Sequence, residues 1–108
     1  MTPEEPMPKP DGFDTSSRRT VEIVLVTAPR CHFCTGASDL LQSLSDLYHL
    51  TVRKIELEST EGVEIATRFA VPFPPVLLID GVYFGHGRIS RRKLVRALDA
   101  ATHAQTLR

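Results

Sequence analysis

Residues 21–27 limit the folds open to this chain more than any other stretch. They read VEIVLVT, a nearly continuous run of β-branched and apolar residues. A run of this kind predicts a central strand buried on both faces. Apolar residues at helical spacing predict a helix over about 31–49, and VRKIEL predicts a second strand over 52–57. Two strands joined through a helix form a βαβ unit, in which the strands are parallel and the crossover is right-handed.

The second half of the chain predicts a hairpin between two further helices. A short helix is expected over about 61–70, stopped by Pro72. A strand is expected over 76–79, and Asp80-Gly81 is a strong hairpin turn leading to a partner strand over 82–84. A last helix is expected from Ser90, as N-cap, to about residue 102. The predicted order is therefore βαβαββα.

Composition narrows the class of protein and the kind of partner. The chain has 108 residues, enough for one domain, which we place over 19–108. Residues 1–18 are rich in proline and acidic side chains and are expected to be a flexible tail. Lys+Arg 13 balance Asp+Glu 13, which argues against a nucleic-acid partner. No apolar run suits a membrane span or a secretory signal, so we expect a cytoplasmic protein. We also expect it to be a monomer.

Both cysteines of the chain lie in the segment APRCHFC, residues 28–34. Cys31 follows a buried strand at the start of a helix, where unpaired amides and the helix dipole stabilise a thiolate. Arg30 and His32 can add positive potential, so the pKa of Cys31 is expected to be lowered. Cys34 falls on the same helix face, within reach of a mixed disulfide formed at Cys31. We therefore predict Cys31 as the attacking thiol and Cys34 as the resolving thiol.

Two other roles of a cysteine pair fit the sequence less well. A structural zinc needs four ligands, whereas the chain has two cysteines and its histidines (32, 49, 86 and 103) lack finger-like spacing. We therefore expect no metal site. A structural disulfide closing so short a loop would remove little entropy from the unfolded chain. A thioredoxin-like binding module whose cysteines do not turn over remains an alternative.

With this element order, two motifs resemble those of the glutaredoxin branch of the thioredoxin superfamily. One is CHFC with an aromatic third residue, Phe33, and the other is PVLLIDG, residues 75–81. The resemblance implies a three-layer α/β sandwich, with a four-stranded mixed sheet flanked by three helices. It also implies a thiol–disulfide oxidoreductase that needs no organic cofactor, with Pro75 cis and beside the nucleophile. Some glutaredoxins bridge an iron–sulfur cluster between subunits, and this is a further alternative.

The segments expected to face the cysteines depart from the glutaredoxin pattern. Pro74 stands where a valine would pair with the substrate through its backbone, and proline has no N–H to donate. GHGR, ending at Arg88, replaces a Gly-Gly pair followed by aspartate. The co-substrate is therefore left open between a low-molecular-weight thiol, such as glutathione or mycothiol, and a disulfide-containing protein. The electron donor is either such a thiol or a reductase.

Other side chains near these motifs have two interpretations. Arg88 belongs to a basic cluster at the start of the last helix, which is either a solvated face or a site for a substrate carboxylate. Phe33 is predicted to be a rim residue. Phe69, Phe73 and Phe84 are interpreted as packing residues.

Overall fold

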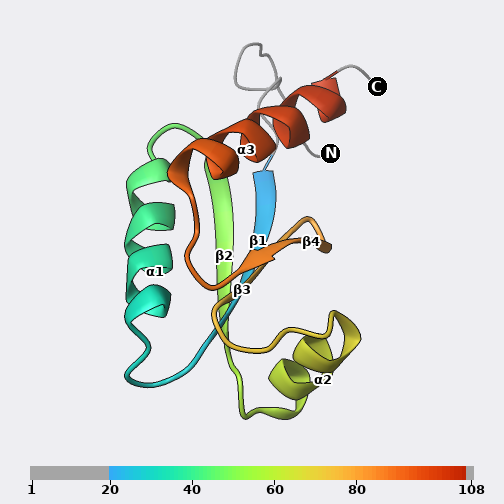
Figure 1. Cartoon of the computed structure of the whole chain (residues 1–108). Coiled ribbons are helices and arrows are strands. Elements are labelled where there is room, and N and C mark those ends of the chain that lie inside the picture. Colours follow the sequence, from blue (N-terminus) through green and yellow to red (C-terminus); the bar gives the residue numbers. More distant parts are fainter. Residues whose placement is uncertain (1–19, 107–108) are drawn as a thin grey trace, which may run out of the picture.

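The computed structural model describes residues 20–106, which form one mixed four-stranded sheet and three helices (Figure 1). The tail predicted over 1–18 lies outside these residues. The observed order is the predicted βαβαββα. The elements are β1 (Thr20–Thr27), α1 (His32–Leu44), β2 (His49–Glu56), α2 (Thr60–Arg68), β3 (Val76–Ile79), β4 (Val82–His86) and α3 (Arg91–Thr106).

The strands lie side by side in the order β2-β1-β3-β4. β1 and β2 are parallel, with Thr20 opposite His49 and Thr27 opposite Glu56. β3 runs antiparallel to β1, and β4 runs antiparallel to β3. The βαβ unit and the hairpin that the sequence predicts therefore join through the β1–β3 pair, and β1 is a central strand.

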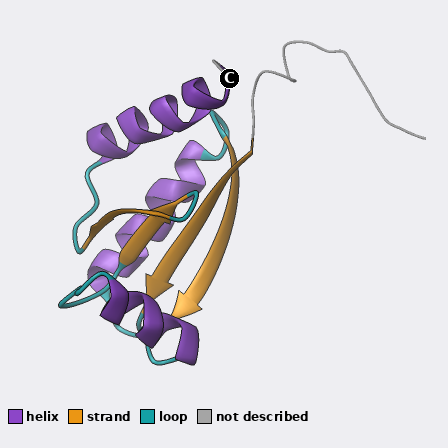
Figure 2. Cartoon of the chain, turned by 90° about the vertical axis from the view of Figure 1, so that its right-hand side faces the viewer, coloured by secondary structure: helices purple, strands orange, loops and turns teal. Residues whose placement is uncertain are grey.

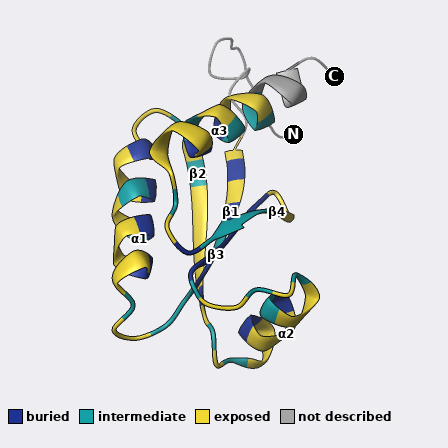
Figure 3. Ribbon diagram, in the orientation of Figure 1, coloured by how far each residue is buried: buried dark blue, intermediate teal, exposed yellow. Residues whose placement is uncertain are grey.

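Two hydrophobic clusters cover the two faces of β1. Val21, Ile23 and Leu25 pack on the face shared with buried residues of α1 and α3. Val26 packs on the opposite face with Ile65 of α2. Figure 2 shows the helices arranged around the sheet, and in Figure 3 the buried positions of α1 lie toward the strands. This arrangement confirms the prediction of a strand buried on both faces.

The first helix is shorter than predicted. It ends at Leu44, and the backbone N–H groups of Leu47 and Tyr48 both donate to the Leu44 carbonyl at 3.0 Å. Tyr48 then packs against the α1–α3 cluster and its hydroxyl donates to Asp99. Leu47 is left 59% exposed. The prediction that the helix continues to about residue 49 was wrong. The chain turns earlier because Tyr48 packs against the α1–α3 cluster and β2 begins at His49.

The second helix buries a different face from the one expected. The apolar pattern places Val63 inward, but Val63 is 52% exposed, while Gly62 and Ile65 are buried. Ser59 caps the helix, and its hydroxyl accepts from the Gly62 N–H at 3.0 Å. The helix has nine residues, and the close approach of Gly62 to the end of β2 determines which of its faces turns towards the sheet.

The hairpin between β3 and β4 combines a tight turn with a bulge. Asp80 and Gly81 have φ of 51° and 81°, the positive values that a type I′ turn requires. Leu77 pairs with Gly85, whereas Leu78 pairs with Tyr83, so one residue of β4 between them is unpaired. Such a bulge changes which face the following side chains take.

Candidate functional site

The site lies where β1 gives way to α1. After Thr27 the chain passes through Ala28-Pro29, and Arg30 takes a φ of 58°. This left-handed conformation costs an L residue roughly 1–2 kcal/mol. Cys31 then adopts an extended conformation, with φ −101° and ψ 107°, and is the N-cap of α1. The strained turn brings Cys31 to the start of the helix, as the sequence predicts.

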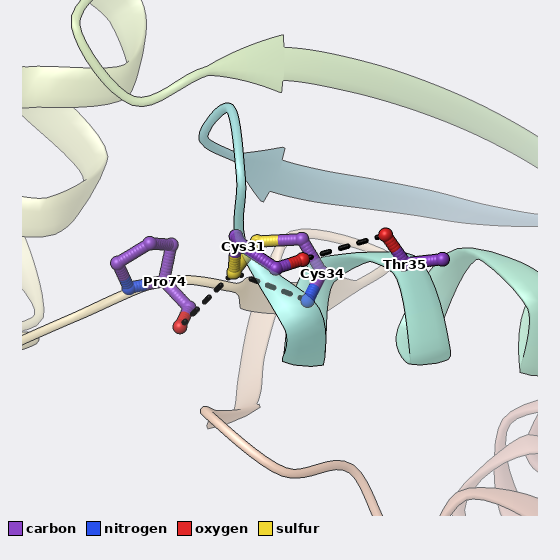
Figure 4. Close-up of a disulfide and its surroundings, with 4 residues drawn as sticks. All are labelled: Cys31, Cys34, Thr35 and Pro74. Atoms are coloured by element: carbon purple, nitrogen blue, oxygen red, sulfur yellow. Dashed lines mark hydrogen bonds between the residues drawn. A yellow bond between two sulfur atoms is a disulfide. The ribbon is translucent and has the colours of Figure 1, made fainter.

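Cys31 and Cys34 form a disulfide, with their Cα atoms 5.1 Å apart (Figure 4). The backbone N–H of Cys34 donates to Cys31 Sγ at 3.1 Å, so the sulfur takes the place of the oxygen that usually caps a helix. Cys34 is only 5% exposed, whereas Cys31 is partly exposed. An incoming thiol or disulfide can therefore reach Cys31 much more easily than Cys34.

The loop that precedes β3, which contains Pro74 and Pro75, faces the disulfide. The Pro74 carbonyl oxygen lies 3.9 Å from Cys31 Sγ. Figure 4 shows this oxygen directed towards the sulfur. The Pro74–Pro75 peptide bond is cis, as the resemblance predicts, and Pro75 is buried. The Gly87 N–H donates to the Pro75 carbonyl at 2.9 Å, which ties the GHGR segment to this loop. In the reduced protein, the Cys31 thiol could donate to the Pro74 carbonyl.

Two hollows open beside the cysteines. The larger, about 610 Å³, reaches both cysteines and extends past Arg30 to Asp39 of α1 and Lys54 of β2. The smaller, about 410 Å³, lies between the start of α1 and the segment before α3. It is lined by His32, Phe33, Gly36, Ala37, Arg88 and Ile89. His32 borders both hollows.

The predicted site residues therefore come together around Cys31. Arg30 and His32 are exposed and line the larger hollow, and Arg88 and Phe33 both line the smaller one. Phe33 is 44% exposed, in keeping with a rim position. Their effects on the thiolate and on substrate binding remain predictions.

The wall of the larger hollow was not predicted. Thr35, Ser38 and Asp39 line it from α1. Their helical spacing could have been recognised as a polar stripe beside the cysteines. Lys54 could not, because it reaches the site through the pairing of β2 with β1, opposite Leu25.

Phe73 corrects the interpretation of the three phenylalanines. Phe69 and Phe84 are partly buried against the two clusters, as expected of packing residues. Phe73 is 50% exposed, and its ring meets the His86 ring edge-on at a centroid distance of 5.1 Å. Pro74 and Pro75 hold the backbone here in an irregular loop, so the side chain before them is not drawn into the core.

Across residues 20–106, no group of three or more His, Cys, Asp or Glu side chains is placed to hold a metal ion. In the same part of the chain, no helix has the length and apolar character needed to cross a membrane.

Comparison with solved structures identifies the fold. A mutant thioredoxin from Halobacterium salinarum aligns with a TM-score of 0.60 at 22% identity, over 82% of this chain and 79% of that one. A Staphylococcus aureus protein of unknown function has a TM-score of 0.60 at 16% identity, over 75% and 90%. Thioredoxin O2 from Arabidopsis thaliana, in its oxidised state, has a TM-score of 0.56 at 20% identity, over 79% and 76%. No family model and no curated protein matches the chain.

The chain thus has a thioredoxin-like α/β fold, with four strands in a mixed open sheet and three helices. Its Cys31–Cys34 pair lies at the start of α1 within this fold.

Proposed function

We propose that this protein is a thiol–disulfide oxidoreductase of glutaredoxin-like type that reduces mixed disulfides through Cys31 and Cys34. The observation that carries the proposal is the unequal exposure of the two sulfurs. Cys31 is partly exposed at the N-cap of α1, while Cys34 is 5% exposed behind it. An accessible attacking sulfur with a shielded partner suits a two-step exchange.

In the first step, the Cys31 thiolate attacks one sulfur of the substrate disulfide. A Cys31–substrate bond forms, the substrate disulfide breaks, and the other substrate sulfur leaves as a thiolate that takes up a proton. In the second step, Cys34 loses its proton and attacks Cys31 Sγ, which forms the internal disulfide and releases the second substrate thiol. Two electrons and two protons pass from the protein to the substrate.

The local geometry supports Cys31 as the attacking sulfur. The Cys34 N–H lies 3.1 Å from Cys31 Sγ and can donate to a thiolate there. The Cys31 N-cap position also places the sulfur at the positive end of the α1 dipole. Hydrogen bonds from backbone amides to an ionised sulfur favour its charged form.

The return to the dithiol needs an electron donor. We propose a low-molecular-weight thiol, with the smaller hollow as its place of contact. Arg88 and Phe33 line that hollow, so a carboxylate and an apolar stem of the thiol would both find a partner there. The cysteine usage further suggests work in a reducing compartment such as the cytoplasm.

The test is to trap the intermediate. A Cys34→Ser variant incubated with a mixed disulfide is expected to accumulate a stable adduct on Cys31, detected by mass spectrometry of its peptides. The Cys31→Ser variant is the matched control and is expected to carry far less adduct, because Cys34 is shielded. Equal labelling of both variants, or none on Cys31, would contradict the proposal. Supplying glutathione, mycothiol or a reductase to the wild type then identifies the donor.

A further inference from the structure

A chain of ring contacts runs from α2 to the loop that faces Cys31. The Phe69 and Tyr83 rings stack at a centroid distance of 5.3 Å. The Tyr83 hydroxyl and His86 Nδ1 share a hydrogen bond of 2.8 Å. The His86 ring then meets the Phe73 ring edge-on at 5.1 Å. Phe73 immediately precedes Pro74, whose carbonyl oxygen lies 3.9 Å from Cys31 Sγ.

The bulge in β4 makes this chain possible. In a regular strand, residues three apart point to opposite faces of the sheet. The unpaired residue between Tyr83 and Gly85 shifts the alternation, so that Tyr83 and His86 can meet on one face. Phe84, by contrast, packs with the α1–α3 cluster on the other side. A bulge beside a reactive centre that re-aims one side chain is a known use of this distortion.

The Phe73 side chain packs against His86 and Gly87 and is otherwise half exposed. A Cβ built on Gly87 would lie 2.8 Å from the Phe73 ring, so the absence of a side chain at Gly87 leaves room for it. Gly87 also has a φ of 70°, which favours glycine. Even so, Phe73 is 50% exposed. A half-exposed phenylalanine that is held in place, one residue before the loop position that faces Cys31, offers apolar surface without first having to be ordered.

We propose that Phe73 determines substrate specificity, and that the preferred substrates are polypeptide disulfides with an apolar residue next to the reacting cysteine. Tyr83 and His86 are positioning residues that hold the ring in place. The inference rests on the proposed function, because it concerns the substrate attacked by Cys31. Phe33, 44% exposed and two residues after Cys31, is a second exposed ring near the cysteines and lines the smaller hollow.

A polypeptide with an apolar residue beside its cysteine is expected to bind next to Phe73 better than a substrate that lacks such a residue. Pro74 has no N–H, so the loop can offer the substrate backbone an acceptor but no donor at this position. With fewer backbone hydrogen bonds available, burial of an apolar substrate side chain against Phe73 contributes more to the choice of substrate. Burial of part of an apolar side chain against Phe73 would raise kcat/KM roughly 3- to 10-fold over a substrate without that side chain.

The experiment compares two short peptides that differ only in the residue before their cysteine, phenylalanine in one and glycine in the other. Each is joined through its cysteine to thionitrobenzoate, the better leaving group, so attack by the reduced protein places the peptide on Cys31 and releases the chromophore. Cys34 then frees the peptide. The protein is reduced beforehand and followed through a single turnover, so no further reductant is needed. The readout is the ratio of the second-order rate constant (kcat/KM) for the phenylalanine peptide to that for the glycine peptide, which a general loss of stability or activity does not change.

For the wild type the ratio is expected to be roughly 3 to 10. Phe73→Ala is expected to bring it close to 1, mainly through KM. Tyr83→Phe keeps the stack on Phe69 but removes the hydroxyl that holds His86, and is expected to lower the ratio by about half. Val82→Ala, on the same strand and at a side chain that is 67% exposed, is the matched control and is expected to keep the wild-type ratio.

The outcomes separate this inference from the proposed function. If the wild type reduces both peptides equally well, the specificity inference is overturned while the oxidoreductase proposal stands. If it reduces neither, the proposed function fails and the inference with it. A Phe73→Ala variant that retains the wild-type ratio overturns the role of Phe73. A Tyr83→Phe variant that retains it overturns the positioning role.

Discussion

Gly62 lies where the first turn of α2 meets the end of β2, and replacing it with alanine tests how closely these two elements must approach. A Cβ at this position would overlap the Glu56 carbonyl oxygen and lie 2.8 Å from the Leu57 carbonyl oxygen. Both are backbone atoms, so no side chain can move aside. The Glu56 carbonyl also accepts from the Ser59 N–H at 3.0 Å and the Ser59 hydroxyl at 2.6 Å. Any shift of α2 that relieves the overlap therefore disturbs its cap.

The size of the effect follows from two opposing contributions. Overpacking against a rigid neighbour costs roughly 1–3 kcal/mol, and contact with backbone places this case at the upper end. Alanine in place of glycine within a helix returns about 1 kcal/mol. The expected net loss is about 2 kcal/mol in the free energy of unfolding. Gly36→Ala is the matched control, because a Cβ there meets no atom within 4 Å, and it is expected to gain up to about 1 kcal/mol.

The assay is urea unfolding of the oxidised proteins, followed by circular dichroism, with the midpoint and slope determined for the wild type and both variants. The same chemical change should move the midpoint down at Gly62 and up at Gly36. An unchanged midpoint for Gly62→Ala would show that α2 can move away from β2 at little cost. An equal loss in Gly36→Ala would show that the effect is general to helical glycines and does not arise from the contact.

Three further predictions use the same unfolding assay. Ser59→Ala removes the hydroxyl that caps α2 and should cost about 1 kcal/mol; no loss would mean that water replaces the cap. Leu44→Ala opens a cavity at a fully buried position and should cost about 2–5 kcal/mol, and a smaller loss would show that the end of α1 collapses to fill it. Burial, with a hydrogen bond to Asp99, raises the pKa of Tyr48 from 10.0 to about 12. The contribution of the Tyr48 hydroxyl to the free energy of unfolding is therefore fully present below pH 10 and declines as pH rises towards 12. Tyr48→Phe should be less stable than the wild type at pH 9 and should lose less stability between pH 10 and pH 12. Parallel curves of stability against pH for the two proteins would refute this.

The elements with local signals were predicted well. VEIVLVT has too little polarity for an exposed strand, and β1 is buried on both faces. Asp80-Gly81 supplies the two positive φ values of its turn. Ser90 accepts from the Lys93 N–H at 3.3 Å, the contact expected of an N-cap. In each case a few neighbouring residues decide the conformation, so the sequence pattern is sufficient.

The predictions that failed depended on distant neighbours. The periodicity that extended α1 past Leu44 is real, but Tyr48 gains more by packing with the α1–α3 cluster beside Asp99. The inward face of α2 was assigned to Val63 because its side chain is apolar, whereas the space against β2 admits only a glycine. Neither competing contact is visible within a local window of sequence.

Local sequence patterns are sufficient to predict the order of the elements, with Cys31 at the start of a helix and Cys34 behind it. Short-range sterics, helix-end electrostatics and apolar periodicity act over a few residues and can be recognised there. The surroundings of the cysteines, by contrast, depend on how the sheet is assembled. The pairing of β2 with β1 brings Lys54 to the larger hollow, and the β4 bulge turns His86 towards Phe73. These placements depend on register and on one unpaired residue in a strand, which are settled only when the sheet assembles.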